Sequence, residues 1–216
     1  MRRRCKQVAK EVARITSSGQ DATSIVYALE QYGEMIAPWA QDVMLNIVEM
    51  SDAQNVNMWR ELSNKLAERL HTLTTQDAVS AAIRELSLEG ARLITSIPID
   101  IAVEVESFAQ AAAITGTRHE ALADYIASRG GVAQSRAELI ARTETSRQTT
   151  ILTQTRAVSI GSEGYIWRTS DDGRVRPSHA AMEGQFVKWS EPPTLDGLTG
   201  HAGALPNCRC YPEPIV

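Results

Sequence analysis

The residues best suited to chemistry gather near the end of this 216-residue chain. The segment HAGALPNCRCYPEP, residues 201–214, holds Cys208 and Cys210 one residue apart, with His201 seven positions before the first cysteine. Residues two apart in an extended segment point to the same side, with Cα atoms roughly 6.5 Å apart. Two sulfurs on one side suit a soft divalent metal. Zinc binding is therefore one interpretation of this segment.

A tetrahedral zinc site needs two further ligands. His179 and His201 are the available nitrogen ligands, and Asp171 or Asp172 offers a weaker oxygen ligand. The Cys-x-x-Cys pattern typical of zinc knuckles is absent. Buried, reduced thiols in a packed strand are the first interpretation and a metal site the second, whereas a disulfide between residues this close would close a strained ring. The spacing leaves these alternatives open.

The same histidines and aspartates suggest an enzyme as an alternative. A small metal-dependent nuclease would use His179, His201 and the nearby aspartates around a divalent ion that activates water. Such a site keeps a metal position open to solvent, whereas a structural site is closed. The sequence has no phosphate-binding glycine loop and no GxSxG, HExxH or GxGxxG motif. These absences favour a protein that is not an enzyme, with no catalytic residue assigned.

Composition limits the partners of the chain. With 43% apolar residues the chain can bury a sizeable core, and its net charge of −4 provides no global basic field. A local basic face remains compatible with that charge. No stretch of eighteen apolar residues occurs, which predicts a soluble protein without a membrane partner. Three cysteines fit a reducing compartment.

Residues 1–115 are predicted to form an α-helical domain. The spacing Ser51-Asp-Ala-Gln54 is typical of a capping box and predicts a helix start. Four residues of the following helix, at spacings of three and four, are predicted to lie in the core: Trp59, Leu62, Leu66 and Leu70. Pro98 predicts a kink or a helix boundary, because proline removes a helical hydrogen bond.

Residues 116–216 are predicted to form a second domain, which begins with a helical hairpin over residues 117–160. Capping boxes begin at Thr117 and Ser135, and Gly130-Gly131 separates the two helices. A helix-turn-helix that binds DNA is an alternative, provided that the arginines of the second helix are unpaired. These arginines are Arg136, Arg142, Arg147 and Arg156. The acidic residues Glu138 and Glu144 between them favour ion pairs instead.

A β-rich module is predicted over residues 161–216, since YIWRTS and QFVKW are short runs of strand-forming residues. Trp167 and Phe186 are its predicted core. Arg174 follows a turn at Asp172-Gly173 and is predicted to pair with Glu144 or Asp172. The fold class is α+β: a helical array, a helical hairpin and a small β-rich module.

The last third of the chain resembles the phage Mu F-type minor head protein family, also called the head morphogenesis family. The resemblance rests on the order of its motifs, an Arg-Thr-Glu helix, a Trp-bearing strand, Asp-x-Arg-x-x-x-x-His, Gly-x-Phe and a closing Cys-Arg-Cys. In this sequence they are Arg142-Thr143-Glu144, Trp167, Asp172 with Arg174 and His179, Gly184 with Phe186, and Cys208-Arg209-Cys210. Residues 90–136 are similar more weakly.

The resemblance implies a structural role in virion assembly. Its expected partners are the portal protein and the scaffold or major capsid protein, with packaged DNA nearby and several copies in each particle. The expected location is the phage head, assembled in the bacterial cytoplasm. The expected interaction residues are structural: Arg142, Glu144, Trp167, Asp172 and Arg174.

The resemblance also bears on zinc. Some relatives have a cysteine pair around the positions of Arg176 and His179, which would complete a four-ligand zinc site with the Cys-x-Cys. This sequence has Arg176 there instead, so that His179, Cys208 and Cys210 remain as ligands, with His201 or an aspartate as the expected fourth.

Overall fold

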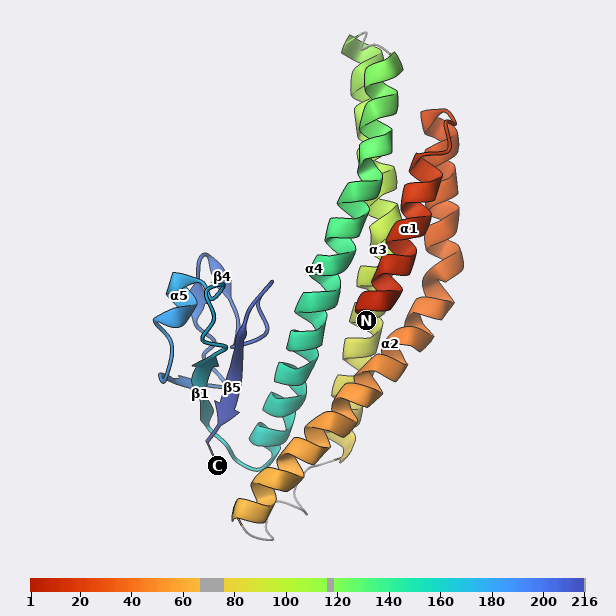
Figure 1. The fold of residues 1–216 in the computed structure, drawn as a ribbon. Helices are drawn as coiled ribbons and strands as arrows, with labels where there is room; N and C mark the ends of the chain where they lie inside the picture. Colours follow the sequence, from red (N-terminus) through yellow and green to blue (C-terminus); the bar gives the residue numbers. More distant parts are fainter. Residues whose placement is uncertain (67–75, 116–118, 216) are drawn as a thin grey trace. The chain divides into compact units, whose positions relative to one another are not determined.

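The computed structural model describes residues 1–66, 76–115 and 119–215, and it consists of long helices followed by a small β-rich module (Figure 1). The helices are α1 (Arg2–Thr16), α2 (Ala22–Leu66), α3 (Gln76–Thr115), α4 (His119–Ser159) and the short α5 (Pro177–Ala180). The strands are β1 (Gly164–Thr169), β2 (Phe186–Lys188), β3 (Thr194–Leu195), β4 (Leu198–Thr199) and β5 (Cys210–Pro214). The predicted α+β class is confirmed. No helix in the described ranges contains an apolar segment long enough to cross a lipid bilayer.

The chain forms two compact units, each built from separate stretches of sequence. The first contains residues Met1–Met44 and Leu88–Ala141, and the second contains the described residues of Leu45–Ser87 and Arg142–Val216. Each of α2, α3 and α4 therefore contributes to both units. The predicted domain boundary between residues 115 and 116 stays a prediction.

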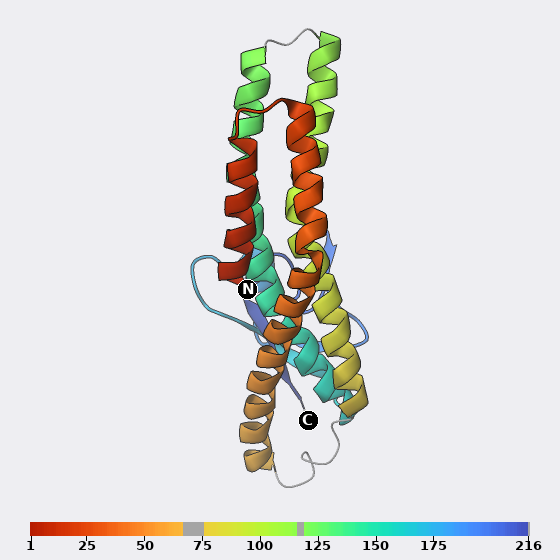
Figure 2. The ribbon, with the colours of Figure 1, turned by 90° about the vertical axis from the view of Figure 1, so that its right-hand side faces the viewer.

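The first unit is a helical bundle. Helix α1 buries Cys5, Val8, Val12 and Ile15 at spacings of three and four, which places its apolar residues on one side. Within this unit α1 lies beside α4 and α2 lies beside α3 (Figure 2). The other helices contribute core residues that include Ile25, Leu29, Met44, Ile94, Ile101 and Val105.

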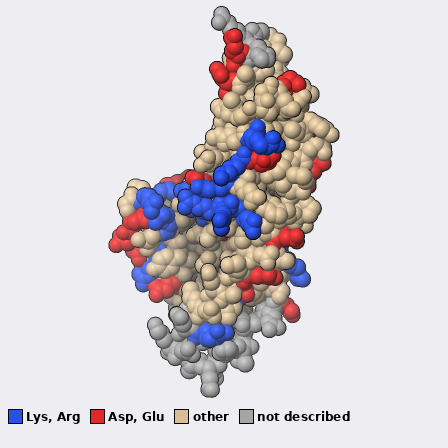
Figure 3. Space-filling model, turned by 45° about the vertical axis from the view of Figure 1, so that its right-hand side comes forward, with Lys and Arg blue, Asp and Glu red and all other residues tan. Residues whose placement is uncertain are grey.

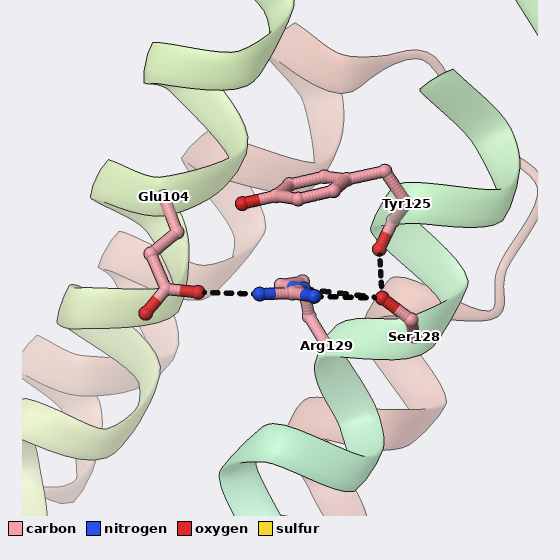
Figure 4. A network of polar contacts seen from close by, with 4 residues as sticks. All are labelled: Glu104, Tyr125, Ser128 and Arg129. Atoms are coloured by element: carbon pink, nitrogen blue, oxygen red, sulfur yellow. Dashed lines mark hydrogen bonds and ion pairs between the residues drawn. The ribbon is translucent and has the colours of Figure 1, made fainter. Parts of the chain in front are cut away.

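A polar network joins α3 to α4 inside the first unit (Figure 4). The Arg129 guanidinium forms an ion pair of 2.9 Å with Glu104 and lies 4.2 Å from the centre of the Tyr125 ring. It also donates to the Ser128 hydroxyl. The Phe108 ring stacks on the Tyr125 ring, with 3.9 Å between the ring centroids.

The helical hairpin predicted over residues 117–160 is wrong, because α4 is a single helix that continues through Gly130-Gly131 and Ser135. A glycine within a helix costs only about 1 kcal/mol relative to alanine, which packing can outweigh. Gly130 also has a packing role, since a Cβ atom there would lie 2.8 Å from the Cβ atom of Ala13. The predicted capping box at Thr117 begins outside the described residues.

Two other predicted interruptions also lie inside helices. Helix α2 continues through Ser51, whose hydroxyl donates to the carbonyl of Ile47 at 3.0 Å instead of capping a helix start. Helix α3 likewise continues through Pro98. There Gly33 of α2 allows close packing, since a Cβ atom on it would lie 2.9 Å from Ile99. Packing therefore outweighs these local signals.

The predicted core stripe of α2 is only partly described. Trp59 is buried, which confirms its prediction. The side chains of Leu62 and Leu66, and all of Leu70, lie outside the described residues.

The module in the second unit is an antiparallel sheet in the order β2-β1-β5. Trp167 is opposite Pro212, and Tyr165 is opposite Val187. Strands β3 and β4 form a separate hairpin, whose turn residues Asp196 and Gly197 both have positive φ angles, as its tight connection requires.

The core of the module surrounds Trp167, which is fully buried as predicted. Trp59 of α2 and Ala157 of α4 belong to the same cluster. The prediction that Phe186 is a core residue is wrong, because its side chain is 50% exposed. Successive residues of a strand face opposite sides, and in β2 it is Val187 that faces inward.

The outer edge of β5 carries two prolines. The backbone N–H and C=O groups of Trp167 form hydrogen bonds with the segment that leads into β2. The backbone groups of its neighbours Ile166 and Arg168 therefore point towards β5. The backbone groups of Pro212 and Pro214 therefore face away from the sheet. Neither proline has an N–H group to offer there.

Candidate functional site

The module brings His179, Cys208 and Cys210 together, as predicted. The Nδ1 atom of His179 lies 3.4 Å from the sulfur of Cys208 and 3.6 Å from the sulfur of Cys210. One donor atom from each residue lies within 4.8 Å of the others, and all three residues are buried. Both cysteines are free thiols. The predicted alignment of the two sulfurs towards one side is confirmed.

Local structure places each member of this cluster. Pro177 begins α5, where its fixed φ angle suits the first helical position, and so places His179 in the helix. The chain turns at Asn207, which has a φ angle of +54°, immediately before Cys208. The side chain of Asn207 accepts a hydrogen bond from Arg142, and its backbone N–H donates to the Thr143 hydroxyl. The Arg-Thr-Glu segment of α4 therefore holds the loop that presents the cysteines.

The two thiols differ in acidity. The pKa of Cys208 is lowered, first by the hydrogen bond from the thiol of Cys210 and then by the N–H group of Gly203 and the charge of His179. The N–H group of Gly203 lies 3.3 Å from the Cys208 sulfur. The pKa of Cys210 is raised, first by its hydrogen bond to Cys208 and then by burial. The N–H group of Gly203 thus favours negative charge on the Cys208 sulfur.

The cluster has the donor atoms that a zinc ion prefers. Bond lengths of about 2.3 Å to sulfur and about 2.0 Å to nitrogen place the ligands of a tetrahedral ion about 3.5 Å apart. The observed separations of 3.4 and 3.6 Å fit this spacing. No fourth histidine, cysteine or carboxylate joins the group within the described part of the chain. The residues present therefore fit three of the four positions.

His201, a predicted fourth ligand, makes other contacts. Its Nδ1 atom lies 3.2 Å from the Tyr165 hydroxyl, and its ring packs edge-on against Tyr165 and Trp189. Burial lowers the pKa of His201 and so favours the neutral imidazole. The Tyr165 hydroxyl also accepts a hydrogen bond from the N–H group of Ala202. His201 therefore holds the loop at Ala202 in place through its contacts with Tyr165 and Trp189.

Asp172, another predicted oxygen ligand, pairs with Arg209. The Arg209 guanidinium donates from Nε to one carboxylate oxygen at 3.0 Å and from a second nitrogen to the other oxygen. This pair lowers the pKa of Asp172, first through the hydrogen bond from Arg209. The other candidate, Asp171, is exposed and has a φ angle of +49°.

The predicted pairing of Arg174 is only partly correct. Its guanidinium lies 3.7 Å from Asp172 and its side chain is 76% exposed. Glu144 is buried and pairs instead with Arg147, three residues later, at 3.4 Å. Arg209 makes the bidentate contact because it directly precedes β5, where its backbone carbonyl accepts a hydrogen bond from Ser170 beside the Asp172 turn. The alternation of Cys-Arg-Cys signals that Arg209 faces away from the two thiols, but it does not identify the partner.

The predicted condition for a DNA-binding helix, unpaired arginines along α4, is not met. Each of the four has a partner in its own unit. The pairs are Arg136 with Asp100, Arg142 with Asn207, Arg147 with Glu144, and Arg156 with Asp52 and Asn55.

Arg176 stands at the position where the resemblance led us to look for a metal ligand. Its guanidinium donates to the carbonyl of Pro206 and lies 3.6 Å from Asp196. It therefore connects the start of α5 to the loop that precedes the cysteines. The sequence did not suggest this role, because Pro206 and Asp196 are distant in the chain.

Comparison with known proteins identifies the family. The family model described as "Phage Mu protein F like protein" matches residues 104–212, about half of the chain, including α4, β1, α5 and most of β5. An uncharacterized protein from Haemophilus influenzae is 30% identical over 198 residues, which cover 90% of this chain and 44% of that protein. The chain thus spans less than half the length of this relative. No solved structure matches. The chain belongs to the family of phage Mu protein F like proteins, a family of phage head morphogenesis.

Proposed function

We propose that the chain is a minor head protein that acts in phage head morphogenesis by binding the portal protein and the scaffold or major capsid subunits. The match of residues 104–212 to the family model is the observation that carries this proposal. The role is structural, and the protein is located in the phage head after assembly in the bacterial cytoplasm. Several copies enter each particle.

The arrangement of the module supports a structural role over the nuclease alternative. A nuclease of the predicted kind needs His179, His201 and an aspartate around one ion. Instead, His201 contacts Tyr165, and Asp172 pairs with Arg209. His179 is 1% exposed, so water has little access to its ring. The polar residues of the module therefore hold its loops in place.

Assembly with the portal is tested by expressing the chain together with the portal protein and the capsid proteins of the same phage. We expect the chain to co-purify with the portal, and particles formed without it to be defective or to lack packaged DNA. Normal, fully packaged heads in its absence, together with no association with portal or capsid proteins, would refute the proposed function.

We further propose that the cluster holds a structural zinc ion through His179, Cys208 and Cys210. The buried donor set and the spacing of its atoms support this proposal. Bound zinc would join α5 to β5 and so add to the stability of the module. The fourth ligand would come from outside the group of three.

Zinc content per chain is the direct test. We expect nearly one zinc per purified chain, and a lower melting temperature after chelation. Cys208→Ser and Cys210→Ser should each lose the metal, whereas Cys5→Ser, which changes a buried thiol in the first unit, should keep it. Zinc-free protein that does not take up the ion, and whose melting temperature is unchanged by a chelator, would contradict the proposal.

A further inference from the structure

Basic side chains gather on the face of the molecule drawn in Figure 3. In the sequence they are densest at the start of α1, where the first ten residues carry five basic side chains and no acidic one. These are Arg2, Arg3, Arg4, Lys6 and Lys10. Three of them lie in the first turn, where the positive end of the helix dipole makes additional positive charge unfavourable. Helix stability therefore does not explain their position.

Most of this charge is not neutralised. Within the described ranges, Lys6 is the one member of the group that forms an ion pair, with Glu138 of α4 at 3.1 Å. The pKa of Glu138 is lowered, first by the hydrogen bond from Lys6 and also by the charge of Arg2. The side chains of Arg3, Arg4 and Lys10 are exposed. Glu138 thus faces two of these cations, Lys6 and Arg2.

Three of these cations form a ridge along α1. Arg2, Lys6 and Lys10 are four residues apart, so they follow one another on the same side of the helix, about 6 Å apart and over about 12 Å in total. Lys6 and Lys10 line a hollow of about 300 Å³ between α1 and α4. Its other lining residues are Ala9, Ala13, Gly130 and Gln134. Small residues border the hollow, and the amide of Gln134, which also lines it, hydrogen-bonds to Glu138.

We infer that this ridge, Arg2, Lys6 and Lys10 with the hollow beside it, binds the phosphate backbone of a nucleic acid without reading its sequence. Each strand of a duplex carries one phosphate for every 3.4 Å along its axis, so a ridge of 12 Å faces about three successive phosphates. Guanidinium and ammonium groups are the donors that phosphates prefer. This surface lies on α1, apart from the α4 arginines considered above, and goes beyond the proposed binding to the portal.

Salt-dependent binding of a duplex of arbitrary sequence tests the inference. Fluorescence anisotropy would compare the full chain with the variant Arg2→Gln/Lys10→Gln, which keeps the Lys6 ion pair. A matched control removes the same charge from α3, with Arg84→Gln/Arg92→Gln, both at exposed positions. We expect the chain's affinity to fall steeply with salt. Each phosphate contact that the ridge variant loses should lower affinity at 0.1 M salt by up to about eightfold and reduce the salt slope by about 0.9.

The outcomes separate this inference from the proposed function. Weaker DNA binding by the ridge variant alone, with unchanged melting temperature and unchanged association with the portal, supports the ridge as a nucleic-acid surface. Equal DNA affinities for the ridge and control variants, or no salt-dependent binding by the unmodified chain, would overturn it. Loss of portal association without loss of DNA binding would also overturn it and would assign the ridge to an acidic protein partner.

Discussion

The Cys-Arg-Cys segment makes two different contacts because its side chains alternate. Cys208 and Cys210 face His179, whereas Arg209 between them faces away and donates hydrogen bonds to the Asp172 carboxylate. On one side of this segment the two cysteines contact His179 of α5. On the other side Arg209 contacts the turn at Asp172. Neither contact depends on the other chemically, so each can be removed by itself.

The Arg209–Asp172 pair should make stability depend on pH. The pKa of Asp172 is depressed below its ordinary 3.8 by the hydrogen bond from Arg209, so the pair stabilises the fold above that pH. This contribution is lost as the pH falls through the depressed pKa. We expect Arg209→Gln to be less stable than the unmodified chain near neutral pH, with the difference shrinking in strong acid. Urea denaturation across this range measures it, and Arg84→Gln, which removes an exposed arginine of α3, is the control.

Trp167 and Phe186 predict effects of different size when an aromatic ring is removed from the same sheet. Trp167→Ala should cost about 3 to 5 kcal/mol of unfolding free energy, because the indole is fully buried. Phe186→Ala should cost about 1 kcal/mol or less, because half of its side chain is exposed. Chemical denaturation compares the two variants. Similar losses of unfolding free energy in the two variants would contradict the exposed position of the Phe186 side chain.

At the scale of elements, the adjacent glycines of α4 have different environments. A Cβ atom at Gly130 would lie 2.8 Å from the Ala13 side chain and 3.0 Å from its backbone, whereas one at Gly131 meets nothing within 4 Å. Gly131→Ala should therefore stabilise the protein by about 0.5 to 1 kcal/mol, because alanine favours the helix. Gly130→Ala should destabilise it by about 1 to 3 kcal/mol through overpacking against α1. Thermal melts of both variants test this difference. Equal shifts in melting temperature would contradict the close approach of α1 and α4 at Gly130.

Ligand types and the family resemblance predicted that His179 meets both cysteines. Periodicity and composition were sufficient to predict the helical first half and the position of the β-rich module. Those features depend on residues that are close in sequence or on strongly patterned side chains. The long helices were divided wrongly, since Ser51, Pro98 and Gly130 signal interruptions that packing between distant segments overrides. The partner of Arg209 could not be predicted, because pattern identifies the side a residue faces and not what lies there.

At the scale of the whole molecule, the second unit depends on a segment far from the module in sequence. Arg156 of α4 is 4% exposed and bonds to Asp52 and Asn55 of α2, and Trp59 of α2 joins the cluster around Trp167. The predicted domain of residues 116–216 lacks all three α2 residues. The boundary before residue 116 would therefore cut through contacts that this unit uses.

A fragment of residues 116–216 tests that boundary. We expect it to unfold at lower denaturant than the second unit of the full chain, because Arg156 and the core around Trp167 lose their α2 partners. Near-ultraviolet circular dichroism of the module tryptophans would follow the transition. The full-length variant Asn55→Ala, which removes one of the same contacts, should show a smaller loss in the same direction. A fragment as stable as the full chain would confirm the boundary.

The prolines on the outer edge of β5 affect how copies of this chain behave when crowded. A bare sheet edge is a template on which another strand can form hydrogen bonds, and repeated additions lead to fibrous aggregates. Pro212 and Pro214 deny that edge the donors that such growth requires. Growth of a continuous cross-β ribbon from this edge of the sheet is therefore disfavoured.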